Sequence, residues 1–119
     1  MHSQPYQKLV TWQRAMDLVP KIYKLTNDIP PHEQFGLISQ IQRASVLIAA
    51  NIAEGQTRES PRAFAYHLSL ARGKLAQVET LLQIALKLHY IRPAQVDALK
   101  GNLADLRRLL AGLVRKVEA

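Results

Sequence analysis

Four polar side chains form the arrangement in this sequence that comes closest to a site for chemistry. At about 100° of rotation per residue they fall together on one side of a helix: Gln40, Arg43, Asn51 and Glu54. A guanidinium and a carboxylate on one side of a helix could hold a polar substrate. They could equally hydrogen-bond neighbouring helices or subunits, because buried polar groups need partners. We favour this second, structural role in stability or assembly.

Other catalytic or metal-binding patterns do not occur in the sequence. Carboxylate-bridged metal sites in helical bundles use Glu-x-x-His, which places two ligands one turn apart, and no acidic residue here has a histidine three positions later. The histidines are His2, His32, His67 and His89. They form no recognisable pattern with a carboxylate and a nucleophile, and we interpret them as surface or helix-end residues. We predict no metal, no cofactor and no enzymatic activity.

A second polar row is basic and belongs to the last part of the chain. Within about 100° of helical arc stand Lys100, Arg107, Arg108 and Arg115. The chain has a formal net charge of +7, and residues 56–119 carry +6 of it (eleven Lys or Arg against five Asp or Glu). The row could bind nucleic-acid phosphates weakly and without sequence preference. It could equally be a solvated face, because Asp97 and Glu118 lie on the same side and no aromatic platform accompanies it.

Length and composition indicate one soluble domain over residues 1–119. There is no cysteine, which excludes disulfides and thiolate metal sites. The N-terminal segment has no apolar signal core. The longest apolar run, residues 44–50, is far shorter than the roughly 20 residues that cross a bilayer. We expect a cytoplasmic protein without a membrane partner.

The first polar row belongs to a central helix predicted over residues 33–55. Turn residues bound this stretch: Pro30 and Pro31 precede it, and Gly55 is expected to end it. Its core face comprises Leu37, Ile38, Ile41, Ala44, Ser45, Ile48 and Ile52. Little free polar surface remains, so we expect the helix to be covered on more than one side, and by more than its own chain.

The segment before it predicts a first helix that is capped by Thr11 and ends near residue 26. Apolar residues recur at helical spacing: Trp12, Ala15, Met16, Val19, Ile22 and Leu25. Pro20 lies inside this pattern. We expect it to bend the helix without ending it, because the period continues through the proline.

Ser60 followed by Pro61 predicts the start of a third helix that runs to about residue 88. Its core stripe is Phe64, Leu68, Ala71, Leu75, Val78, Leu82 and Ala85, and a second apolar stripe holds Leu70, Leu81, Ile84 and Leu88. One bundle core needs only the first stripe, so the second suggests cover by another copy of the chain. Gly73 costs about 1 kcal/mol against alanine in a helix, for which close approach of another backbone is one compensation.

Pro93 opens a fourth helix. Its seam follows a regular three-and-four spacing: Val96, Leu99, Leu103, Leu106, Leu110, Leu113 and Val117. Four helices with short connections predict an all-α fold, an antiparallel up-and-down four-helix bundle.

The run RASVLIAANIAEG at residues 43–55 resembles the four-helix-bundle family of 23S rRNA-intervening sequence proteins. Further matching positions are Leu9, Trp12, Gln13, Tyr23, Thr26, Pro30, Glu33, Phe35, Gly36, Leu37, Gln40, Ala71, Gly73, Leu75, Glu79 and Leu82. Leu47 and Ala49 depart from the family's pattern, which often has Ser and Pro there. The resemblance implies the bundle fold, a closed ring of five subunits (a homopentamer) and an RNA or nucleoprotein partner.

We therefore hypothesise a non-enzymatic helical bundle that self-assembles and serves as a nucleic-acid or nucleoprotein accessory module. Two alternatives stay open. One is a protein-interaction scaffold with no nucleic-acid role. The other is a small enzyme that uses Arg43, Asn51 and Glu54.

Overall fold

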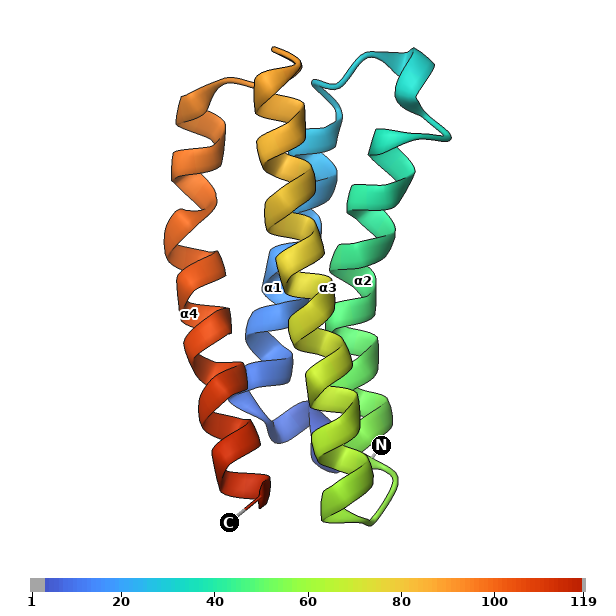
Figure 1. Ribbon diagram of the computed structural model, residues 1–119, viewed down its shortest axis with the longest axis vertical. Coiled ribbons are helices and arrows are strands. Elements are labelled where there is room, and N and C mark those ends of the chain that lie inside the picture. Colours follow the sequence, from blue (N-terminus) through green and yellow to red (C-terminus); the bar gives the residue numbers. More distant parts are fainter. Residues whose placement is uncertain (1–3, 119) are drawn as a thin grey trace.

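Long helices make up most of the chain in this computed structural model, which describes residues 4–118. In chain order they are α1 (Val10–Thr26), α2 (Leu37–Gln56), α3 (Pro61–Lys87) and α4 (Pro93–Glu118). Short 3₁₀ turns at Pro5–Lys8 and Pro31–Glu33 precede α1 and α2. Each long helix runs antiparallel to the one before it (Figure 1). This confirms the predicted all-α, up-and-down four-helix bundle. His2 lies outside the described residues.

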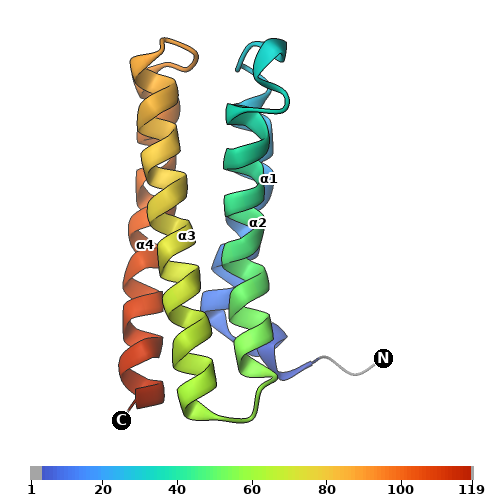
Figure 2. The same cartoon turned by 45° about the vertical axis from the view of Figure 1, so that its right-hand side comes forward.

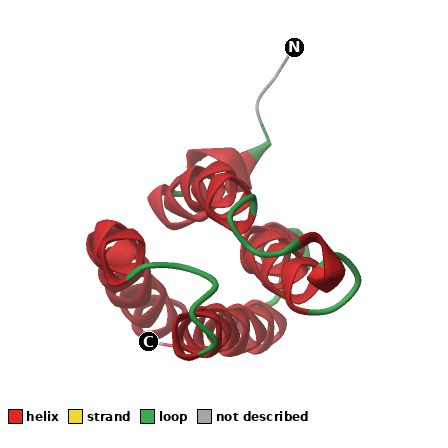
Figure 3. Cartoon of the chain, turned by 90° about the horizontal axis from the view of Figure 1, so that it is seen from above, coloured by secondary structure: helices red, strands yellow, loops and turns green. Residues whose placement is uncertain are grey.

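The helices surround one core in the order in which they follow along the chain. α1 packs against α2 and α4, and α3 packs against the same two helices. Seen from above, the four helices stand at the corners of a square (Figure 3), and a side view shows the pairs α1–α2 and α3–α4 (Figure 2). Between residues 4 and 118 no helix is long and apolar enough to cross a membrane.

Helix α1 differs from the expectation at its start and along its core face. It begins at Val10, so Thr11 is a buried residue of the first turn and not the cap. Leu18 is buried, whereas Met16 is 44% exposed. The bundle turns α1 so that Ala15, Leu18 and Ile22 face inward. Pro20 lies inside a continuous helix, as predicted.

Helix α2 buries the whole of its predicted core face, but Gly55 does not end it. The helix continues to Gln56. A Cβ atom at Gly55 would lie 2.6 Å from Cβ of His67 and 3.2 Å from Cδ1 of Phe64, both on α3. The glycine is therefore needed where α2 and α3 cross closely, which is a packing role that the helix-end signal concealed.

Helices α3 and α4 begin at the predicted residues. The Ser60 hydroxyl accepts a hydrogen bond from the Ala63 N–H at 3.3 Å, and Pro61 is the first residue of α3. Pro93 likewise opens α4. Gly73 gives a different result, since a Cβ atom there would meet nothing within 4 Å. No close backbone approach within the described chain explains this glycine.

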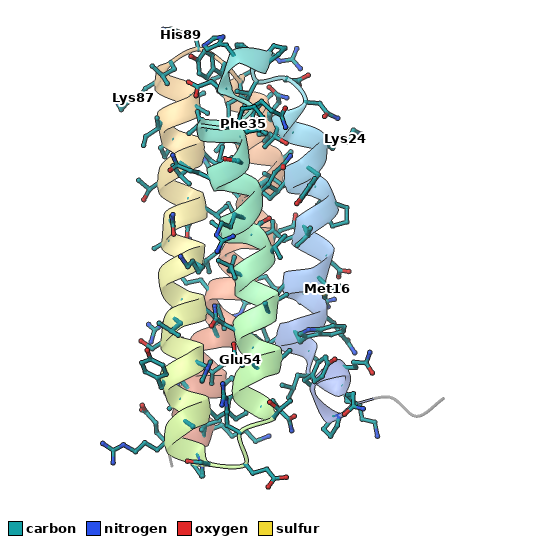
Figure 4. The ribbon with its side chains drawn as sticks, turned by 90° about the vertical axis from the view of Figure 1, so that its right-hand side faces the viewer. Met16, Lys24, Phe35, Glu54, Lys87 and His89 are labelled. Atoms are coloured by element: carbon teal, nitrogen blue, oxygen red, sulfur yellow. The ribbon has the colours of Figure 1, made fainter. Side chains whose placement is uncertain are left out.

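The connections at one end of the bundle are tied together by Tyr90, and we call this the Tyr90 end. The Tyr90 hydroxyl donates to Oε2 of Glu33 at 3.2 Å, and Oε1 of Glu33 accepts from the Leu37 N–H at 3.1 Å. Partial burial and the Glu33 carboxylate both raise the pKa of Tyr90. The α3–α4 turn is thereby fixed to the start of α2. Figure 4 shows Phe35, Lys87 and His89 toward this end and Glu54 toward the other.

Candidate functional site

The polar row of α2 lies on an open side of that helix. Gln40, Arg43 and Glu54 are exposed and Asn51 is half-buried. The Asn51 side-chain amide donates to the Leu47 carbonyl at 2.8 Å. Among residues 4–118 the Arg43 guanidinium makes no ion pair, and Glu54 pairs with other residues. The row is therefore neither a buried network within one chain nor a closed pocket.

Glu54 instead belongs to a cluster at the α2–α3 turn that the sequence did not predict. Its Oε1 lies 2.7 Å from an Arg58 nitrogen and 3.7 Å from Nε2 of His67. The hydrogen bond from Arg58 is the main cause of a lowered pKa at Glu54, and the charge of His67 adds to it. Because a carbonyl only accepts, the His67 Nδ1 donates to the Ala63 carbonyl, at 2.9 Å.

The nearby hydroxyl groups do not complete a nucleophilic site around His67. Thr57 Oγ1 donates to the Glu54 carbonyl at 2.8 Å, and Ser60 Oγ caps α3. Neither hydroxyl is hydrogen-bonded to the imidazole, which nucleophilic catalysis by such a pair requires. Within residues 4–118 no group of three His, Cys, Asp or Glu side chains is placed to hold a metal ion. The geometry of this cluster therefore serves the crossing of the two helices.

A row of apolar and small residues follows the outward side of α3. We call it the outer row of α3: Tyr66, Leu70, Gly73, Ile84 and Leu88. Its large side chains are 61%, 38%, 41% and 49% exposed in that order. Leu81, from the same predicted stripe, is buried inside the bundle. At the Tyr90 end, Phe35 precedes α2 and is 95% exposed. Much of the predicted second stripe is therefore uncovered in one chain.

The basic row of α4 is largely occupied by ion pairs. Lys100 lies 2.9 Å from Asp97, Arg107 pairs with Glu79 on α3, and Arg108 pairs with Asp105. Arg115 alone of the four makes no ion pair within the described chain. The row also divides between two sides of α4. Lys100 and Arg107 line a hollow against α3, whereas Arg108 lines one against α1.

Another group of cations meets between α1 and α4 at the Tyr90 end. Lys21 and Lys24 come from α1, and Arg92 directly precedes α4. They line a hollow of about 480 Å³ whose floor includes Leu25 and Leu99. Sequence reasoning missed this group because its members are far apart in the chain. The only local signal was that Lys21 and Lys24 fall on one side of α1.

Comparison with known proteins gives one family and one fold. Residues 7–112 match the family model described as 23S rRNA-intervening sequence protein. A crystal structure of a protein of unknown function from the S23 ribosomal protein family of Bacteroides thetaiotaomicron superimposes with a TM-score of 0.76. The two sequences are 24% identical, over 88% of this chain and 98% of the other. That likeness shows a shared bundle fold. The comparison with curated proteins gave no match.

Proposed function

This chain belongs to the 23S rRNA-intervening sequence protein family, and from that premise we propose a non-enzymatic bundle protein that self-assembles and binds RNA. The binding is weak and independent of sequence. The exposed outer row of α3 is the observation on which the proposed self-assembly rests. The excess of positive charge supports the choice of partner.

The outer row of α3 supports assembly because its composition suits a helix interface. Isolated apolar side chains on a surface are ordinary, but several on one side of a helix suit a contact surface. Leu70, Ile84 and Leu88 follow the outward side of the helix, and Gly73 leaves open space between them. A helix of a second copy could approach closely at that glycine. Phe35, directly before α2, is a further exposed apolar side chain at the Tyr90 end.

The polar row of α2 supplies hydrogen-bonding groups next to this surface. α2 and α3 are packed together, and Gln40, Arg43, Asn51 and Glu54 are open or half-open in a single chain. Assembly through the same side of the bundle would give Gln40 and Arg43 the partners that one chain does not provide within its described residues. A contact that joins different faces of two copies produces a closed ring when the rotation closes, and we take five subunits as the ring size.

RNA is the proposed partner because positive charge remains after the internal ion pairs are formed. Five Lys or Arg side chains pair with carboxylates in residues 4–118: Arg14, Arg58, Lys100, Arg107 and Arg108. The net charge of +7 stays uncompensated. Such a surface binds a phosphate backbone by releasing its counterions. In an assembly, several copies would contact one strand together and strengthen the binding. Arg115 of the α4 row contributes to this binding. Lys100, Arg107 and Arg108 contribute only the positive potential that their ion pairs leave.

Fluorescence anisotropy of a labelled single-stranded RNA tests this proposal when it is combined with light scattering of the same sample. We expect an assembled protein whose affinity for RNA falls steeply as salt is raised. An assembled protein that binds no RNA at low salt would favour the scaffold alternative. A monomer that binds no RNA would reject both parts of the proposal.

A further inference from the structure

The hollow between the C-terminal part of α1 and the start of α4 has three properties that suit an anion: positive charge, a concave shape and lining residues that are held in place. Lys21, Lys24 and Arg92 line it, and its volume is about 480 Å³. Leu25 and Leu99 form an apolar floor and are only 6% and 5% exposed. Apolar surroundings strengthen electrostatic attraction relative to open water. The hollow is therefore a better place to hold an anion than isolated cations on a convex surface.

The cations of this hollow are not neutralised by the chain. Within residues 4–118, none of the three makes an ion pair with a carboxylate. Among the described residues, Asp28 is the only carboxylate that lines the hollow, and its Oδ2 accepts from Nε2 of Gln95 at 2.5 Å. The same Gln95 side chain accepts from the Arg92 N–H at 2.8 Å through Oε1. Gln95 therefore holds the carboxylate and the Arg92 backbone in place while the cationic ends stay available.

The start of α4 adds a second, independent source of positive potential. The aligned peptide dipoles of a helix place partial positive charge at its N-terminus. α4 is 26 residues long, it starts at Pro93 beside the hollow, and its first turn contains no acidic residue to offset the dipole. The long helix and the three side chains thus favour an anion at the same place.

The neighbouring hollow between α1 and α4 differs because most of its cations are paired with carboxylates. There, Arg14 lies 3.3 Å from Asp105, and Arg108 pairs with the same carboxylate. Arg14 also lies 3.7 Å from Asp17. Two of the three cations of this second hollow, Arg14 and Arg108, are therefore paired with carboxylates of the chain itself. Lys21 lines both hollows, so they are continuous along the two helices.

We propose that the hollow formed by Lys21, Lys24 and Arg92 binds phosphate groups of an RNA backbone. This inference rests on the proposed RNA binding and names the surface that makes the contact. No aromatic side chain from residues 4–118 lines the hollow, so this part of the chain offers no platform there on which a base could stack. The contact therefore depends on the charge of the phosphates and not on the base sequence of the RNA. In an assembly, each subunit would present one such site to the strand.

A pair of double variants tests the site. Lys24→Gln with Arg92→Gln removes two cations of the hollow. Arg72→Gln with Lys74→Gln removes two cations of α3, one exposed and one half-buried, that also make no ion pair within the described chain. The two variants therefore have the same net charge. Anisotropy with labelled single-stranded RNA is measured over a range of salt. The salt slope of the hollow variant should fall by about 1.4, since each phosphate contact on a single strand contributes about 0.7.

The outcomes separate this inference from the proposed function. Loss of slope and affinity in the hollow variant, with the α3 variant close to wild type, supports the site. Equal behaviour of the two variants, while wild type binds, overturns the site and leaves RNA binding intact. Absence of binding by wild type overturns both. A parallel titration with a labelled nucleoside triphosphate identifies the ligand, because a hollow variant that loses only the nucleotide would show a small-molecule site instead.

Discussion

Oε1 of Glu54 lies 3.7 Å from Nε2 of His67, across the turn that joins α2 to α3. The imidazole is fixed from the other side by its Nδ1, which donates to a backbone carbonyl of its own helix. Beside this pair, Gly55 of α2 faces the Cβ atom of His67 with no room for a side chain. The pair and the glycine together define where the two helices cross.

Gly55→Ala should destabilise the fold. The new methyl group would lie 2.6 Å from Cβ of His67, so a helix has to move. Overpacking of this kind costs about 1–3 kcal/mol of folding stability. The better helix propensity of alanine offsets about 1 kcal/mol of that cost. Urea unfolding followed by circular dichroism measures the net loss.

Gly73→Ala is the matched control for that substitution. A Cβ atom at Gly73 meets nothing within 4 Å, so the same change should raise the folding stability of a single chain by about 1 kcal/mol. Equal effects of the two alanines would show that the close contact at Gly55 does not exist. Weaker assembly of Gly73→Ala at unchanged or raised chain stability would place the glycine at the contact between copies.

Glu54 should make a pH-dependent contribution to stability. Its pKa is lowered in the folded state, first by the Arg58 hydrogen bond, from an ordinary value of 4.5. The stabilisation is therefore present above pH 4.5 and is lost as the pH falls through the lower, folded value. Glu54→Gln should be less stable than wild type at about pH 7, and the two should converge only once the pH has fallen below the lowered pKa of Glu54 in the folded state. An Arg58→Gln background should remove most of the difference; a difference that persists at low pH would contradict this assignment.

Ile84→Lys with Leu70→Lys should disrupt assembly without unfolding the bundle. Both side chains are partly exposed in one chain, so lysine can extend into water there, but it would bring charge into a contact with a second copy. Met16→Lys is the control, because Met16 is 44% exposed and Ile84 is 41% exposed, on helices at opposite corners of the bundle. Light scattering should show a lower mass for the α3 variant only. If both variants assemble like wild type, the outer row of α3 is not the contact.

Arg43→Ala should weaken assembly and leave a single chain intact. Arg43 is exposed and makes no ion pair within residues 4–118, so the bundle loses little when it is removed. If assembly buries the guanidinium against a carboxylate, its removal strands that partner at a cost on the order of 3 kcal/mol. Sedimentation at several protein concentrations gives the dissociation constant. A constant equal to that of an Arg72→Ala control would remove Arg43 from the interface.

Most of the fold could be predicted because its signals are local. The leucine seam of α4 and the Ser60–Pro61 start of α3 each depend on spacing within one helix, and both agree with the structure. The errors arose where the choice depends on a neighbour. Thr11 has the chemistry of a cap, but the turn before it already leads into the helix at Val10. Met16 and Leu18 are both apolar, and only the rotation of α1 against the bundle decides which one is buried.

The candidate sites were harder to predict because they join separate helices. The α4 row was predicted as one basic arc, yet its members line hollows on two sides of the helix. Arg107 pairs with Glu79 of another helix, and no pattern within α4 reveals that. His67 meets Glu54 only because Gly55 lets the helices cross. Lys24 and Arg92 are 68 positions apart in the chain and line one hollow. The spacing of residues along one helix gives no information about such contacts between helices.

The mass of the untagged protein in solution, measured by light scattering at micromolar concentration, decides whether the uncovered row of α3 has a partner. One chain weighs 13.4 kDa. We predict a single species whose mass is an integer multiple of that value, five chains if the ring closes as proposed, and a shift of this species toward one chain in the Leu70→Lys, Ile84→Lys variant. A wild-type mass of 13.4 kDa would contradict self-assembly and leave the outer row of α3 as an ordinary exposed helix surface.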